Sequence, residues 1–183
     1  MKHTFFNSFL GILFLTIVSS SCSSNLDFNQ VNDLQLEPAY IANLAHFDIP
    51  AKEFVAGGIE QSVVYAVPTV DVFNDAFFRD NLVRADFAFK INNTINRAYT
   101  LDITLLDANN VPLYVMHFDV PAYTGTENIV EKTEIFENIK LNLLKRTTKM
   151  AFVLNMKPGP LLDENSSGSL KLDSGVTAYF VVR

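Results

Sequence analysis

Apolar and polar residues alternate along several segments of this chain, and that two-residue period constrains its fold more than any other feature. The clearest case runs from residue 83 to residue 91. The apolar side chains on one face are Val83, Ala85, Phe87, Phe89 and Ile91. Successive side chains of a strand point to opposite faces, so this segment is predicted to be a β-strand with one buried face. The same alternation predicts strands over 99–105 and 112–120, with turn chemistry at 107–110 between them.

Weaker strand signals lie on both sides of this region. They cover residues 34–37, 40–49, 62–67, 129–136, 149–156 and 176–182. Pro, Gly, Asn and Asp residues separate these segments, as turns require. The best helix candidate is 137–148, where Ile139, Leu143 and Leu144 recur near helical spacing. Residues 73–82 fit either a single helical turn or an irregular corner.

Seven to nine short strands with at most one short helix predict an all-β fold, an antiparallel β-sandwich. A hairpin over 83–120 is expected at its centre. The stretch from Phe87 to Tyr114 has an Asn-Thr loop, a long strand, an Asp-x-Asn-Asn turn and then Pro-Leu-Tyr. In this it resembles the immunoglobulin-like and fibronectin type III domains of envelope proteins. The resemblance implies a sandwich of that kind and assigns no functional residue.

The N-terminus has the composition of a secretory signal peptide. Lys2 precedes an apolar run over residues 9–18, and Ser19-Ser20-Ser21 leads into Cys22, the only cysteine. The run is shorter than the roughly 20 residues that span a bilayer. Small residues before a cysteine resemble the lipobox of bacterial lipoproteins, with Ser19 where that family usually has Leu. The resemblance implies that Cys22 receives a diacylglyceryl group and carries acyl chains such as palmitate as the mature N-terminus.

These features predict a signal peptide over 1–21, a flexible tether over 22–32 and a single β-sandwich domain over 33–183. Relaxed lipoboxes are typical of Bacteroidota, so the resemblance implies an envelope lipoprotein of a bacterium of that kind. Ser23, the residue after the cysteine, resembles the residue at that position in lipoproteins that are sent to the outer membrane. The choice between the periplasmic and the surface face of that membrane stays open. The alternative is ordinary cleavage after Ser21, which would leave Cys22 as a free thiol.

The charge balance argues against nucleic acid as a partner. The chain has 14 Lys and Arg against 20 Asp and Glu, a formal net charge of −6. Loss of residues 1–21 removes Lys2 and no acid, which leaves 13 − 20 = −7. The basic residues form no stripe along the sequence, so the electrostatic support for nucleic-acid binding is missing.

No catalytic, metal-binding or cofactor-binding residue is predicted. His46 and His117 have no partner at metal-ligand spacing, and no nucleophile or phosphate-loop motif occurs. An acidic, amide-rich corner lacks the spacing of a calcium loop, and its members are expected to cap turns: Asp71, Asn74, Asp75, Asp80 and Asn81. Asp163 and Glu164 lie in a polar loop that is poorly suited to acid–base chemistry.

The expected function is therefore that of a membrane-anchored envelope lipoprotein with a non-enzymatic structural or accessory role. Its expected partners are the membrane, through the lipid on Cys22, and another envelope protein. The alternative is a glycan- or lipid-binding module. Tyr40, Tyr114 and Tyr123 are the candidate platforms for a sugar, although Tyr on a strand more often packs in the core. A third hypothesis is a hydrolase, which would need two carboxylates to converge in a cleft.

Overall fold

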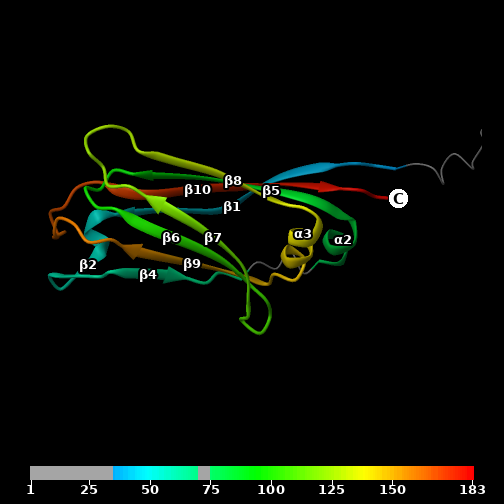
Figure 1. Cartoon of the computed structure of the whole chain (residues 1–183), viewed down its shortest axis with the longest axis horizontal. Helices are drawn as coiled ribbons and strands as arrows, with labels where there is room; N and C mark the ends of the chain where they lie inside the picture. The colour runs from blue at the N-terminus through cyan, green and yellow to red at the C-terminus, as the bar shows by residue number, and fades with distance from the viewer. Residues whose placement is uncertain (1–34, 70–74) are drawn as a thin grey trace, which may run out of the picture. The chain divides into compact units, whose positions relative to one another are not determined.

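Eight strands pair into two four-stranded antiparallel sheets in the computed structural model, which describes residues 35–69 and 75–183 (Figure 1). The first sheet has the order β1 (Ala39–Pro50), β10 (Ser169–Phe180), β5 (Leu82–Asn93), β8 (Ile129–Phe136). The second has the order β4 (Val63–Ala66), β9 (Lys149–Met156), β6 (Tyr99–Leu106), β7 (Pro112–Val120). Leu36–Val182 is a compact unit. The predicted signal peptide, the tether and the start of the domain at residue 33 lie outside the described residues.

The strand pairs are nested along the chain. β6 pairs with β7, β5 with β8, β4 with β9, and β1 with β10, so the strands form one long hairpin. The hairpin is folded over on itself, because β10 also pairs with β5 and β6 also pairs with β9. This arrangement is the eight-stranded jelly roll. The expected antiparallel β-sandwich is confirmed, but its strand order is not the immunoglobulin or fibronectin type III order.

The expected hairpin over 83–120 is only half present, because β5 and β6 lie in different sheets. The link between them crosses the end of the sandwich and buries Ile95 completely. Asn93 closes this link: its Oδ1 accepts a hydrogen bond from the Ile95 N–H at 3.0 Å, and its Nδ2 donates to the Arg97 carbonyl at 2.7 Å. β6 and β7 do form a hairpin, and Asn110 in its turn has φ 63°.

At most positions, the alternation in the sequence correctly predicts which side chains are buried in the core. The inward residues of β6 are at most 1% exposed, namely Tyr99, Leu101, Ile103 and Leu105. Phe89 of β5 contacts Phe118 of β7 with ring centroids 5.2 Å apart, so the two sheets pack directly on each other. Val83 is 46% exposed instead of buried, because the register with β10 shifts between Tyr179 and Phe180. A bulge of this kind turns side chains to the other face.

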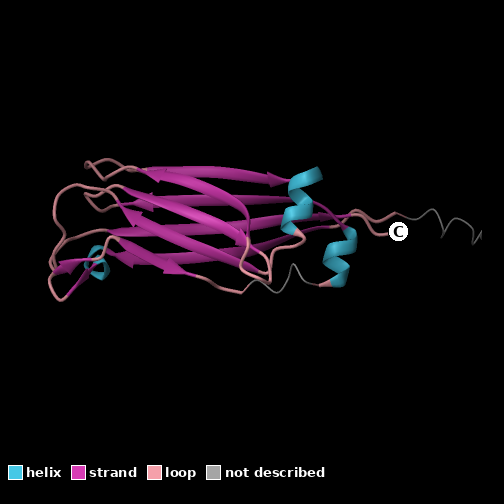
Figure 2. Cartoon of the chain, turned by 60° about the horizontal axis from the view of Figure 1, so that its bottom comes forward, coloured by secondary structure: helices cyan, strands magenta, loops and turns pink. Residues whose placement is uncertain are grey.

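The described residues contain two α-helices, one more than the sequence predicts. α2 (Ala76–Asn81) begins after Asp75, whose Oδ1 accepts a hydrogen bond from the Phe78 N–H at 3.2 Å. α3 (Asn138–Leu144) is shorter than the predicted 137–148. Both helices lie at the same end of the sandwich (Figure 2). The 3₁₀-helix η2 (Ala51–Phe54) precedes a hairpin of β2 (Val55–Ala56) and β3 (Ile59–Glu60).

Within the described ranges, no helix has the length and hydropathy needed to cross a membrane.

Candidate functional site

An open trough crosses the outer face of the β1-β10-β5-β8 sheet and is the candidate functional site. Its volume is about 700 Å³, which is within the range of small-ligand sites. All four strands contribute lining residues, and none of the lining residues belongs to the second sheet. The trough therefore opens to solvent and is separate from the core between the sheets.

Small residues form the floor of the trough. Gly175 of β10 pairs with Ala88 of β5, and these two occupy the middle strands. Asn43 of β1 pairs with Gly175, and Thr133 of β8 pairs with Ala88, so polar side chains lie at both ends of this row. The two central positions carry at most a methyl group. A ligand can therefore approach the backbone of the sheet there.

A row of charged and ionisable side chains forms one wall, and we call it the charged row. Its members in order across the sheet are His46, Asp173, Lys90 and Glu131. His46 Nδ1 lies 2.7 Å from Asp173 Oδ1, and Lys90 Nζ lies 3.5 Å from Glu131 Oε1. All four side chains are more than half exposed. Pairs this exposed add little to stability, so they remain available to an incoming polar partner.

A β-bulge in β1 shapes the trough beside the floor. The register with β10 shifts between Asn43 and Ala45, which leaves Leu44 as the extra residue. Ser174 repairs the backbone pairing: its Oγ accepts from the Ala45 N–H at 3.0 Å and donates to the Ala45 carbonyl at 2.7 Å. The bulge is therefore held by a side chain that the opposite strand supplies.

The two histidines of the predicted mature chain lie on different sheets. His46 belongs to the charged row, whereas His117 lies on the outer face of the second sheet, where its Nδ1 is 2.5 Å from Asp102 Oδ1. Its Nε2 is 3.6 Å from Asp119 Oδ2. A hydrogen bond from Lys157 at 2.6 Å holds the pKa of Asp119 below its usual value. Among the described residues, no group of three His, Cys, Asp or Glu side chains is placed to hold a metal ion.

The other residues considered from the sequence do not gather at one place. Cys22, Asp71 and Asn74 lie outside the described residues. Asp75 caps α2, as predicted for that corner. Asp163 closes its own turn by accepting hydrogen bonds from the Asn165 N–H and the Ser166 Oγ, at 2.9 and 3.0 Å.

The three tyrosines proposed as sugar platforms are separated as well. Tyr40 packs edge-on against Phe180, with ring centroids 5.5 Å apart. Tyr114 packs on Phe136 in the same manner at 5.5 Å. Tyr123 follows the β7 strand, and its N–H donates to the Ile95 carbonyl at 2.9 Å. None of the three lines the trough.

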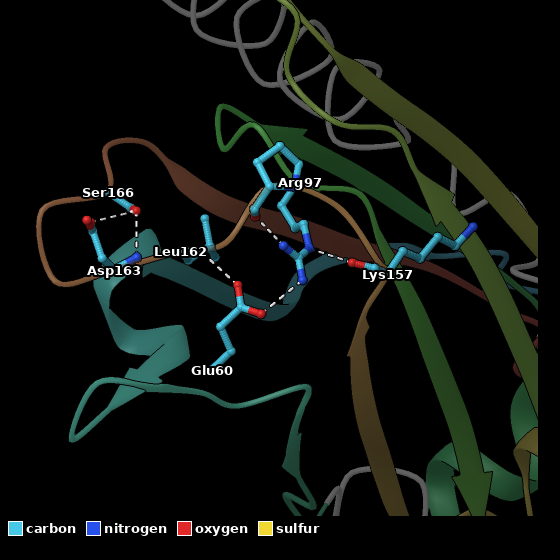
Figure 3. A network of polar contacts seen from close by, with 7 residues as sticks. Glu60, Arg97, Lys157, Leu162, Asp163 and Ser166 are labelled. Carbon is cyan, nitrogen blue, oxygen red and sulfur yellow. Dashed lines mark hydrogen bonds and ion pairs between the residues drawn. The ribbon is translucent and has the colours of Figure 1, made fainter.

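A buried ion pair fixes the end of the sandwich that carries the β2–β3 hairpin (Figure 3). Arg97 Nη2 donates to Glu60 Oε2 at 3.1 Å, and the Arg97 residue is 5% exposed. The guanidinium also donates to the carbonyls of Lys157, at 2.5 Å, and Pro160. Glu60 Oε1 accepts from the Leu162 N–H at 2.7 Å. The pair thus satisfies three backbone groups of the loop that follows β9, which is a structural role.

A second polar cluster closes the side of the sandwich between β7 and β8. Glu134 Oε1 accepts hydrogen bonds from the Tyr114 hydroxyl at 2.5 Å and from Lys140 Nζ at 2.6 Å. Burial opposes ionisation of Glu134, but these two bonds outweigh it and lower the pKa of its carboxyl. The hydrogen bond between Lys140 and Glu134 is the largest cause that raises the pKa of the Lys140 ammonium, and the hydrogen bond with Tyr114 is the next. Glu134 and Lys140 are therefore both ionised at neutral pH, and their ion pair holds α3 against the strands.

Sequence reasoning did not find the trough. Its floor and the charged row come from four strands that are distant in sequence, and only the register between them brings the residues together. The available signals were local: Gly175 interrupts a strand-like run, and a glycine in a strand often marks a bulge or a close approach.

No protein-family model and no curated protein matches this chain. Among solved structures, it is similar to VP2 of the infectious bursal disease virus subviral particle, at 15% identity and a TM-score of 0.42, over 79% of this chain and 39% of that one. It is similar to a Parabacteroides distasonis protein described as secreted, at 15% identity and a TM-score of 0.41, over 63% and 38%. The chain thus spans about two fifths of the length of these two proteins.

A third similarity is to Desmodium yellow mottle tymovirus, at 10% identity and a TM-score of 0.32, over 81% of this chain and 84% of that one. At identities this low, the three similarities concern the fold alone.

Proposed function

We propose that this chain is a lipid-anchored protein of a bacterial cell envelope, with a non-enzymatic accessory role. In this role the trough binds an extended segment of an envelope protein partner. The charged row is the observation that carries the proposal, since it presents paired donors and acceptors across all four strands. The lipid on Cys22 would keep the domain at the membrane where such a partner resides.

The geometry supports a polar, extended occupant. The floor at Gly175 and Ala88 leaves the backbone accessible, while Asp173, Lys90 and Glu131 alternate in charge along one wall, beside His46. Alternating exposed charges discriminate between partners more than they strengthen binding. A partner segment with complementary charges would therefore be selected in one register and bound reversibly.

The anchor is supported by the order of residues at the N-terminus. Lys2, an apolar run and Ser21-Cys22 follow one another as in lipoprotein precursors. One acyl chain binds a membrane only marginally, whereas two or more hold a protein stably. A triacylated Cys22 would thus be a permanent attachment.

Native mass spectrometry of the protein extracted from its own membranes tests both parts of the proposal. We expect a chain that begins at Cys22 with added acyl mass, together with a bound protein. The Cys22→Ala variant should lose the acyl mass. Lys90→Glu should lose the bound partner, whereas Lys52→Glu, the same charge change at an exposed residue of η2, should retain it.

The outcomes separate the alternatives. A chain without acyl mass contradicts the anchor. A partner that remains bound to the K90E variant contradicts the role of the trough. A glycan or lipid that is bound instead of a protein, and is lost in K90E, supports the binding-module alternative in place of the accessory role.

A further inference from the structure

The chain enters the jelly roll at Leu36, beside the end of the last strand. The Leu36 N–H donates to the Val182 carbonyl at 3.0 Å, and the Val182 N–H donates back to the Leu36 carbonyl at 2.9 Å. α2 lies at this end too, since the Val181 N–H donates to the Asn81 carbonyl. The β2–β3 hairpin lies at the opposite end (Figure 1). β10 has 12 residues, so its two ends are about 40 Å apart.

Three large apolar side chains are exposed on the same side of the entry end, and we call them the apolar cap. They are Leu36 at 54%, Tyr40 at 58% and Phe77 at 48% exposed. Tyr40 and Phe77 belong to β1 and α2, yet both rings pack on the buried Phe180, with centroid separations of 5.5 and 5.6 Å. This shared contact holds the aromatic rings in one patch.

Such a patch is suited to a lipid surface. Contiguous exposed apolar side chains mark interaction sites, because each remains in contact with water until a partner covers it. Aromatic side chains are enriched where a protein meets the interface between the lipid headgroups and the acyl chains. The apolar cap combines the aromatic rings of Tyr40 and Phe77 with the aliphatic side chain of Leu36.

The preceding chain favours the bilayer over other partners. Cys22 lies 36 − 22 = 14 positions before Leu36, so the connection reaches at most about 50 Å when fully extended. A lipid on Cys22 would hold the entry end within this distance of the bilayer. The opposite end would on average lie further away, because the sandwich itself lies between.

We propose that the apolar cap rests on the surface of the bilayer that holds the anchor, with Tyr40 and Phe77 in contact with lipid. This contact depends on the proposed acylation of Cys22. Contact through the apolar cap orients the strands roughly perpendicular to the membrane surface. The trough, which lies on a sheet face, then points sideways toward proteins in the same leaflet.

Single-tryptophan fluorescence tests the contact, because the chain has no Trp of its own. The F77W variant reports on the apolar cap. The I59W variant is the matched control, since Ile59 is a 69% exposed apolar residue of β3 at the opposite end. Each acylated protein is purified from its own membranes and placed in phosphatidylethanolamine–phosphatidylglycerol vesicles that contain brominated acyl chains.

We expect the brominated lipid to quench F77W emission about twofold or more and to leave I59W emission unchanged. Leu36→Asp, at a 54% exposed position, should reduce the quenching when combined with F77W. If brominated lipid quenches the emission of acylated F77W and acylated I59W to the same extent, the contact is overturned and the anchor stands. Protein that shows no acyl mass overturns the anchor, and the contact falls with it.

Discussion

Arg97 and Glu60 form an ion pair of 3.1 Å, in which the Arg97 side chain is 6% exposed and the Glu60 side chain is 19% exposed. The pair joins the link after β5 to the β3 strand of the small hairpin. Each partner also binds backbone groups of the loop that follows β9. The arrangement therefore ties three loop segments to one end of the jelly roll, and its loss would leave polar groups without partners.

Replacement of Arg97 should destabilise the protein strongly. Arg97→Met preserves much of the volume but leaves the half-buried Glu60 carboxylate without its cation and the Lys157 and Pro160 carbonyls without this donor, at a cost of about 3–5 kcal/mol. Glu60→Gln keeps an oxygen for the Leu162 N–H, so its cost should be about half as large. Urea unfolding of the two variants measures the difference, and equal costs would show that the charge of Glu60 is not what matters.

Gly168 should be far less replaceable than Gly125, although both have similar φ angles of 96° and 98°. A Cβ at Gly168 would lie 2.3 Å from the Thr94 carbonyl oxygen, whereas a Cβ at Gly125 meets nothing within 4 Å. Gly125→Ala should cost about 1–2 kcal/mol from left-handed strain alone. Gly168→Ala adds the steric conflict and should cost more than twice as much. Similar thermal stabilities for the two variants would contradict the close approach.

Much of the strand content could be predicted from the sequence. The segments 129–136, 149–156 and 112–120 match β8, β9 and β7. Alternation in these segments reports directly on one buried face. The sheet partners could not be predicted, because the nested pairing depends on contacts between distant segments. Asn93 illustrates this, since its dipeptide with Asn92 is typical of a hairpin turn but its side chain closes a link between the two sheets.

The candidate site was predicted less well than the fold. Of the trough residues, the sequence singles out only His46 as a possible functional side chain, and its lack of a partner at metal-ligand spacing argues against a metal site there. The charged row exists because the register of three strand pairs aligns four residues, and no local pattern encodes that alignment. The helix at residues 76–81 depends on a cap at Asp75 that the sequence allowed without requiring it.

The stability contributed by Glu134 should depend on pH in the acid range. Its folded-state pKa is lowered, so the stabilisation is present above the unfolded-state pKa and is lost as the pH falls through the folded-state pKa. We expect Glu134→Gln to be less stable than the parent above about pH 5 and to approach it in more acidic solution. Urea unfolding between neutral and acidic pH checks this, and a difference that stays constant with pH would contradict it.

Ser174 should control the bulge that borders the trough. Its Oγ pairs with both the N–H and the carbonyl of Ala45, so Ser174→Ala leaves two half-buried backbone groups unsatisfied at a cost of about 1–3 kcal/mol. Amide hydrogen exchange should accelerate at Ala45, whose donor bond is lost, and stay slow at Phe47, which pairs with Leu172 further along β1. Thr177→Ala, on the outer face of β10, is the control and should leave the exchange rates of both amides unchanged. Slow exchange at Ala45 in the S174A variant would show that the backbone alone holds the bulge.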